Sequence, residues 1–198
     1  MCSEMTRRGF IGGGAAMAVS GVSAAGHPGK VVPPGIPKRN VALVPAGAKG
    51  LKSFRAKCVG CQLCIRACPE KVLRPSYGSG RFLLPEMGFE LGYCRPGCTR
   101  CAEACPAGAI VAVSAEERLH MQIGRAMWHK DRCVAAKNGV ICTACERHCP
   151  ANAIELRDGT PVIDSSSCIG CGACENLCPA RPLPAITVDG FENHRICG

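Results

Sequence analysis

The sequence predicts an α+β fold that is rich in loops and built from short helices and short strands in two small lobes. Three observations lead to this expectation: 18 of the 198 residues are cysteines, these cysteines recur in four similar runs, and short apolar segments with turn signals separate the runs. Aromatic residues make up only 4% of the chain, so a large apolar core is not expected. The cysteines must therefore organise the fold.

Four cysteine runs follow one another along the chain, and each of them ends in Cys-Pro. They read CVGCQLCIRACP from Cys58, CRPGCTRCAEACP from Cys94, CVAAKNGVICTACERHCP from Cys133 and CIGCGACENLCP from Cys168. The first and fourth have the spacing C-x2-C-x2-C-x3-C-P, which is the bacterial ferredoxin signature of a 4Fe-4S cluster. The second run widens its first gap to three residues and the third to eight, but both keep four cysteines.

The spacing of the runs has a physical cause. Two-residue gaps let a tight loop direct three thiolates at one cluster, and the three-residue step begins a helical turn that directs the fourth thiolate at the neighbouring cluster. The proline then ends this turn. We therefore expect two bacterial-ferredoxin-like lobes with two clusters each, over residues 51–113 and 114–198.

Segments between the runs predict the regular elements of these lobes. After the second run, residues 107–113 read AGAIVAV and predict a strand. The capping box Ser114–Glu117 predicts a short helix that ends near residue 121. Between the third and fourth runs, residues 153–156 and 161–163 predict two strands joined by a tight turn.

All sixteen cysteines of the runs are candidate cluster ligands, and we expect four 4Fe-4S clusters. Which cysteines share a cluster depends on how the runs pair. The short connection between the third and fourth runs favours pairing of neighbours, while a nested pairing of first with fourth and second with third is the alternative. Pairing of neighbours predicts Cys58, Cys61, Cys64 and Cys105 for cluster 1; Cys94, Cys98, Cys101 and Cys68 for cluster 2; Cys133, Cys142, Cys145 and Cys178 for cluster 3; and Cys168, Cys171, Cys174 and Cys149 for cluster 4.

Disulfides and zinc are the two alternative uses of sixteen cysteines. Eight disulfides would suit an exported chain, but disulfide frameworks do not repeat one C-x2-C-x3-C-P period four times. Tetrahedral zinc is the second alternative, but zinc sites usually combine separated C-x2-C pairs rather than triplets. The repeat therefore favours iron–sulfur clusters.

The first 25 residues are interpreted as a targeting segment. Thr6-Arg7-Arg8-Gly9-Phe10-Ile11 resembles the twin-arginine signal, and a Gly/Ala-rich apolar stretch follows it. This predicts export to the periplasm, with the signal either cut after Ala24 or Ala25 or retained as a membrane anchor. Residues 26–50 contain many prolines and glycines and predict an extended linker or strap.

The charge balance excludes some classes of partner. The formal net charge is +9 with every cysteine counted as neutral. Four thiolates around an oxidised cubane carry about −2, so four such sites bring the loaded protein close to neutrality. Nucleic acid is not an expected partner, because no Lys/Arg run exceeds a pair such as Lys38-Arg39. No transmembrane span is expected, because no stretch approaches the roughly 18 to 20 apolar residues required.

The remaining candidate residues are not expected to carry chemistry. Cys2 lies in the targeting segment, and Cys197 is expected to be a free thiol. Trp128 is expected to pack between the lobes, and His148 is placed to donate a hydrogen bond to a cluster sulfur. Dinucleotide loops, P-loops and catalytic triads are absent from the sequence, so we expect an electron carrier without a substrate site.

The order of these features resembles that of the ferredoxin-type NapG/MauM family. The resemblance rests on the twin-arginine signal, the lead-in Pro33-Pro34-Gly35, the four cysteine runs and the stretch IGRAMWHKDRC before the widened third run. It implies a relay of single electrons between a quinol-oxidising polyferredoxin in the membrane and a periplasmic reductase. The alternative is an electron-transfer subunit of a larger oxidoreductase. The spacing of the second run departs from the usual pattern of the family.

Overall fold

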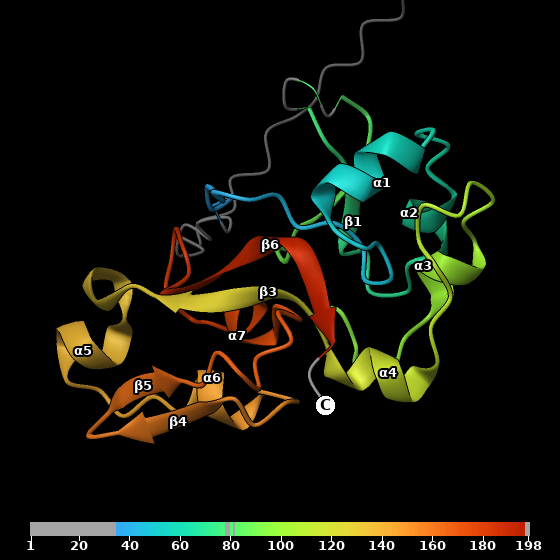
Figure 1. The fold of residues 1–198 in the computed structure, drawn as a ribbon. Helices are drawn as coiled ribbons and strands as arrows, with labels where there is room; N and C mark the ends of the chain where they lie inside the picture. The colour runs from blue at the N-terminus through green and yellow to red at the C-terminus, as the bar shows by residue number, and fades with distance from the viewer. Residues whose placement is uncertain (1–34, 78–79, 81, 197–198) are drawn as a thin grey trace, which may run out of the picture. The chain divides into compact units, whose positions relative to one another are not determined.

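The computed structural model describes residues 35–77, 80 and 82–196, and these belong to one structural unit of short helices and two-stranded sheets (Figure 1). This mixed content confirms the predicted α+β class. The helices are α1 (Leu51–Lys57), α2 (Leu63–Ala67), α3 (Arg100–Glu103), α4 (Ala115–His120), the 3-10 helix η1 (Lys130–Arg132), α5 (Val134–Asn138), α6 (Ala144–Arg147) and α7 (Ala173–Asn176). The strands are β1 (Leu73–Pro75), β2 (Pro85–Met87), β3 (Met121–Trp128), β4 (Ile154–Arg157), β5 (Thr160–Ile163) and β6 (Ile186–Ile196).

Parts of the prediction fall outside the described residues. These parts are the targeting segment 1–25, the beginning of the segment 26–50, and Cys197. The division into lobes at residue 113 stays a prediction. Within the described part of the chain, no helix has the length and apolarity that crossing a membrane requires.

Four of the helices are short turns that follow the cysteine spacing. Helices α2, α3, α6 and α7 each contain the third cysteine of their run, and the fourth cysteine follows within two residues of the helix end. This is the helical turn that the three-residue step predicts. Helix α2 packs against α3, and α6 packs against α7 (Figure 1). The first run therefore packs against the second, and the third against the fourth.

The predicted hairpin between the third and fourth runs is confirmed. Strands β4 and β5 pair antiparallel from Ile154↔Ile163 to Arg157↔Thr160. Asp158 and Gly159 form the turn with φ values of 51° and 73°, which a type I′ hairpin turn requires at both central positions. A second hairpin, β1 with β2, joins the first and second runs.

The strand expected over residues 107–113 is wrong. Gly108 turns the chain with a φ of 60°, and the side chains of Ala109 and Ile110 are buried without a neighbouring strand. The N–H of Val111 donates to the carbonyl of Gly47 at 3.0 Å. The apolar composition therefore reflects burial in a turn and not pairing in a sheet.

The predicted helix after the second run is confirmed, including both hydrogen bonds of its capping box. The Ser114 hydroxyl accepts from the Glu117 N–H at 3.1 Å, and the Glu117 carboxylate accepts from the Ser114 N–H at 2.9 Å. Helix α4 then leads directly into β3, the strand that pairs antiparallel with β6. These are the longest strands in the described residues, and sequence analysis predicted neither of them.

The segment before α1 forms a strap, here defined as residues 39–48, that packs into the core. Residues 42–48 are all buried. The carbonyl of Leu43 accepts from the N–H of Met87 at 2.9 Å, and the carbonyl of Val41 accepts from the N–H of Gly190 at 3.1 Å. The strap therefore contacts both the β1–β2 hairpin and β6.

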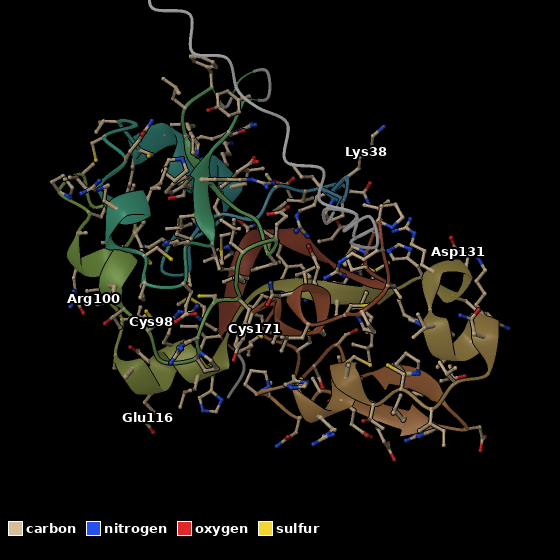
Figure 2. The ribbon with its side chains drawn as sticks, turned by 180° about the vertical axis from the view of Figure 1, so that it is seen from behind. Lys38, Cys98, Arg100, Glu116, Asp131 and Cys171 are labelled. Carbon is tan, nitrogen blue, oxygen red and sulfur yellow. The ribbon has the colours of Figure 1, made fainter. Side chains whose placement is uncertain are left out.

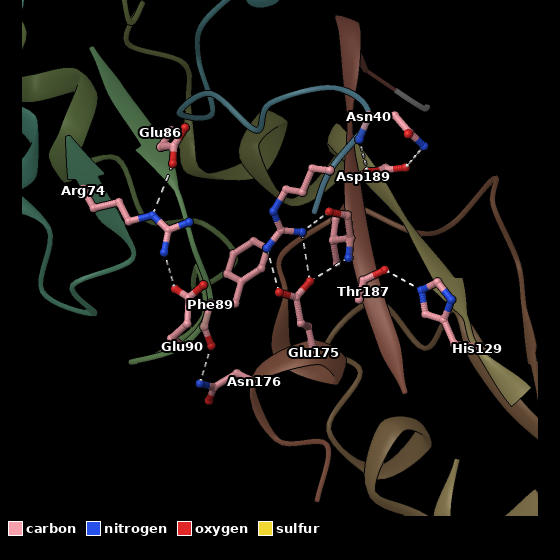
Figure 3. Close-up of polar contacts among 12 residues, drawn as sticks. Asn40, Arg74, Glu86, Phe89, Glu90, His129, Glu175, Asn176, Thr187 and Asp189 are labelled. Carbon is pink, nitrogen blue, oxygen red and sulfur yellow. Dashed lines mark hydrogen bonds and ion pairs between the residues drawn. The ribbon is translucent and has the colours of Figure 1, made fainter. Parts of the chain in front are cut away.

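A buried ion pair holds the start of the strap against α7. The Arg39 guanidinium donates to both carboxylate oxygens of Glu175, at 3.0 and 2.6 Å, and their side chains are 8% and 3% exposed. Glu175 also accepts from the Val188 N–H at 2.6 Å. Arg39 lies over the ring of Phe89 at 5.3 Å from its centroid. Figure 3 shows the contacts that converge on Glu175.

We predict that Arg39→Met destabilises the folded protein strongly. Removing one partner leaves the other charge buried without compensation, which costs about 3–5 kcal/mol. Chemical unfolding followed by circular dichroism measures this loss. Lys38→Met is the matched control, because Lys38 is exposed and surface substitutions change stability by about 0.5 kcal/mol or less. Equal effects of the two variants would contradict the prediction.

A second prediction concerns acid sensitivity through His194. Burial, with a smaller contribution from the charge of Arg118, lowers the pKa of His194 to about 4, whereas an unfolded histidine has a pKa of about 6.5. Between these values the unfolded chain binds more protons, so stability rises with pH through this window and is fully present above it.

Between pH 7.5 and pH 5.5 the free energy of unfolding should therefore fall by about 1 kcal/mol through this residue. His194→Gln removes this part of the pH dependence, which unfolding curves at the two pH values measure. His120→Gln, at an exposed position, keeps the pH dependence of the wild type. An unchanged pH dependence in His194→Gln would show the prediction to be wrong.

Candidate metal centres

The structure gathers the sixteen cysteines of the four runs into four sets of four. Within each set, three cysteines come from one run and the fourth comes from the neighbouring run. All sixteen are free thiols. Pairing of neighbouring runs predicts the same groups, whereas ligation of clusters by them stays a prediction. The first set is Cys58, Cys61, Cys64 and Cys105; the second is Cys68, Cys94, Cys98 and Cys101; the third is Cys133, Cys142, Cys145 and Cys178; the fourth is Cys149, Cys168, Cys171 and Cys174.

Burial raises the pKa of thiols in every set. It raises the pKa of Cys64 and of Cys145 to about 11, and that of Cys101 and of Cys171 to about 12. The other cysteines of each set raise these pKa values further, because neighbouring thiolates repel one another. Thiolates in such a set therefore require a compensating positive charge, which the iron ions of a cluster supply when bound.

Apolar side chains surround the sulfurs. The second set shares its cavity with Val72, Leu73 and Met87. The third shares its cavity with Trp128, Leu156 and Ile186, and the fourth with Ile154, Ile169 and Val188. Around the second set, Leu73 and Met87 belong to the β1–β2 hairpin; around the third and fourth sets, the lining residues belong to the β4–β5 hairpin, to the β3–β6 sheet and to the fourth run. The hairpins and the β3–β6 sheet therefore serve to shield the sulfurs from water.

Backbone N–H groups point at the fourth cysteines of two runs. The N–H of Ala153 donates to the sulfur of Cys149, and the N–H of Ala185 donates to the sulfur of Cys178, both at 3.2 Å. Such hydrogen bonds stabilise negative charge on a ligand sulfur and raise the potential of a cluster bound to it. The backbone at these positions therefore suits cysteines in their thiolate form.

A charged side chain contacts the second set. Arg118, on α4, is buried, and its Nη2 lies 3.1 Å from the sulfur of Cys94. Burial raises the pKa of Cys94, while the Arg118 charge acts in the opposite direction. Sequence analysis missed this residue, because Arg118 lies outside the runs and no local pattern marks an arginine that faces inward.

Two glycines of the fourth run allow close packing. Gly172 has a φ of +82°, and a Cβ at this position would overlap the ring of Phe89. Gly170 has a φ of +73°, and a Cβ there would lie 2.7 Å from the backbone of Gly124 in β3. The fourth run therefore lies directly against β3 and Phe89, which explains why its four cysteines are all buried.

The second set of cysteines lies next to two other sets. In the second set, Cys101 is close enough to Cys64 of the first set for their charges to interact. Cys94 of the second set donates its N–H to the carbonyl of Cys171 in the fourth set at 2.9 Å. Figure 2 labels Cys98 of the second set and Cys171 of the fourth set. The second set is therefore adjacent to both the first and the fourth.

The expectation for His148 is wrong, whereas the packing of Trp128 between lobes stays a prediction. His148 is exposed, and its Nδ1 lies 2.8 Å from the carbonyl of Ala144 in its own helix, which takes the place of the expected contact with a sulfur. Trp128 lines the cavity of the third set, and within the described part of the chain its buried Nε1 has no hydrogen-bond partner.

The donor sets fit 4Fe-4S clusters in number and type. Each set supplies four free thiols from the spacing that wraps such clusters. Among the described residues, no three His, Cys, Asp or Glu side chains are arranged to hold a single metal ion. In a cubane each thiolate binds a different iron atom, and four thiols per set match the four iron atoms of one cluster.

Comparisons with known proteins agree with this chemistry. The family described as 4Fe-4S dicluster domain matches residues 57–109 and 140–181, and each match includes cysteines of two neighbouring runs.

Curated relatives carry the name methylamine utilization ferredoxin-type protein MauM. The protein of Methylorubrum extorquens is 35% identical over 152 residues, which cover 65% of this chain and 64% of the relative. That of Methylophilus methylotrophus is 32% identical, over 72% of this chain and 69% of the relative. That of Paracoccus denitrificans is 33% identical, over 65% and 63%. The matched region thus spans a little less than two thirds of the first relative.

We predict that Cys64→Ser removes one cluster from the protein. Cys64 is the buried third cysteine of the first set, so its loss opens that set while the other three keep four thiols. The iron content should fall by about four atoms per chain, since each cluster holds four. Iron and acid-labile sulfide analysis measures the loss, with Cys197→Ser as a control outside the runs. Unchanged iron in Cys64→Ser would rule out this assignment of the first set.

Proposed function

We propose an electron-transfer function for this chain, which belongs to the family of MauM ferredoxin-type proteins. The observation that carries the proposal is the grouping of sixteen free cysteines into four sets, each with four thiols around one site. Iron–sulfur clusters supply one-electron chemistry when bound, and the protein sets their burial and hydrogen bonding. The chain itself then acts as a carrier and not as an enzyme with its own substrate.

The number of clusters in the proposal is four. The dicluster domain matches the chain twice, and each cysteine set has a complete complement of four thiols. The first set adjoins the second through Cys64 and Cys101, and the second adjoins the fourth through Cys94 and Cys171. These contacts support a relay in which electrons enter and leave at different sets.

The proposed partners are two redox proteins. We propose a quinol-oxidising polyferredoxin in the membrane as donor and a periplasmic reductase as acceptor, with export through the twin-arginine pathway. The support is the motif Thr6–Ile11 and the resemblance to the family. The second candidate function is that of an electron-transfer subunit in a larger oxidoreductase, which a stoichiometric large subunit in the purified protein would favour.

The first test of the function is the content of iron and acid-labile sulfide in protein purified without oxygen. Four cubanes predict about sixteen atoms of each per chain and a broad visible absorption that bleaches with dithionite. Zinc analysis of the same sample is the control, because four thiolates also bind zinc. Zinc without sulfide, or thiols without metal, would overturn the electron-transfer proposal.

A further inference from the structure

We infer that Arg118 raises the reduction potential of the cluster held by the second set, through its contact with the sulfur of Cys94. The inference rests on the function proposed above, because it requires a redox-active cluster at that set. It gives a role in electron flow to a residue that lies outside the four cysteine runs. Arg118 is a positioning residue in this sense: it acts through a ligand and holds no iron itself.

The geometry around Arg118 directs its charge at the second set. The residue is 3% exposed, and its Nη2 lies 3.1 Å from the sulfur of Cys94. Its charge also acts on the thiol of Cys101 in the same set, against the effect of burial on that thiol. One guanidinium therefore interacts with two of the four sulfurs of this set.

Among the residues that the structure describes, no carboxylate forms an ion pair with Arg118, and its Nε has no hydrogen-bond partner there. Both acidic residues of α4, Glu116 and Glu117, are exposed, and Glu117 bonds to Ser114. Burial keeps the neighbouring His194 uncharged at neutral pH by lowering its pKa.

A guanidinium cannot shed its proton in a protein, so Arg118 stays charged in its buried position. A buried charge without an opposite charge is strongly unfavourable. The compensating charge must then come from the second set, whose thiolates and bound cluster are negative overall. This requirement links the burial of Arg118 to the presence of thiolate at Cys94.

The sign of the effect on the potential follows from the charge. Reduction adds one negative charge to a cluster, and a fixed positive charge beside a ligand sulfur stabilises the reduced state more than the oxidised state. Because Arg118 is buried, salt and water screen this interaction only weakly. The second cluster is thereby easier to reduce. It also adjoins the fourth set through the Cys94 N–H and the Cys171 carbonyl, so the effect acts at a junction between sets.

The test is a potentiometric titration of the loaded protein followed by electron paramagnetic resonance. Arg118→Gln and Arg118→Met remove the charge, and Arg118→Lys keeps it. In both neutral variants one midpoint potential should fall, with the ratio of reduced to oxidised cluster at fixed potential dropping about tenfold, which is about 59 mV for a one-electron couple. The midpoints of the other clusters should not change. In Arg118→Lys, which keeps the charge, the midpoint of the second cluster should stay close to its value in the wild type.

Two further variants sharpen the assignment. Arg100 lines the cavity of the second set, but its side chain is 67% exposed and lies near Glu103. Arg100→Gln should therefore shift the potential much less than Arg118→Gln, because solvent screens an exposed charge. Cys98→Ser should change the signal whose midpoint moves in Arg118→Gln, because Cys98 belongs to the same set.

The outcomes separate this inference from the proposed function. Unchanged midpoints in a neutral variant that contains its full iron and sulfide would overturn the inference and leave the function intact. An Arg118→Lys midpoint as low as that of Arg118→Gln would also overturn it, since charge would not be the cause. Loss of the second cluster in both neutral variants, with Arg118→Lys intact, would assign Arg118 a structural role instead. Absence of iron and sulfide from the wild type would overturn the proposed function itself.

Discussion

The buried ion pair between Arg39 and Glu175 connects three parts of the chain that are far apart in sequence. Glu175 directly follows Cys174 of the fourth set, Arg39 begins the strap, and the ring under Arg39 belongs to Phe89. Burying two charges costs several kcal/mol per ion unless additional hydrogen bonds satisfy them, and the Val188 N–H supplies one such bond. The position of the strap and the geometry of the fourth set are thus coupled.

The exchange of fourth cysteines between runs is the second constraint. Each set draws one cysteine from a neighbouring run, so clusters bound as proposed would prevent the runs from separating. Metal binding contributes to folding free energy in proteins of this kind. Under the proposed function, bound clusters would thus stabilise a chain with short helices, two-stranded sheets and few aromatic residues.

The four sets share one type of ligand but differ in their surroundings. The first set includes the exposed Cys61, while three cysteines of the fourth set, Cys168, Cys171 and Cys174, are buried. The second set faces the buried charge of Arg118, and the fourth has the ion-paired Glu175 beside it. Burial, hydrogen bonds and nearby charge are the means by which a protein sets cluster potentials. The sets are therefore chemically distinct sites.

Sequence alone determined the features that depend on neighbouring residues. These are the four runs, the helical turn at each third cysteine, the capping box of α4, and the β4–β5 hairpin with its turn at Asp158-Gly159. Each rests on contacts within a few residues, so spacing and residue type suffice to predict it.

Only the tertiary structure decided the rest. The register of β3 with β6 depends on partners that are distant in the chain. In β3 the pairing register shifts between Gln122 and Gly124, and four consecutive residues are buried, so the sequence lacks the alternation of buried and exposed residues that marks a strand. The burial of the strap and the contact of Arg118 with Cys94 arise in the same way. No local pattern specifies which distant segment an apolar stretch or an inward arginine will meet, because burial is a property of the assembled fold.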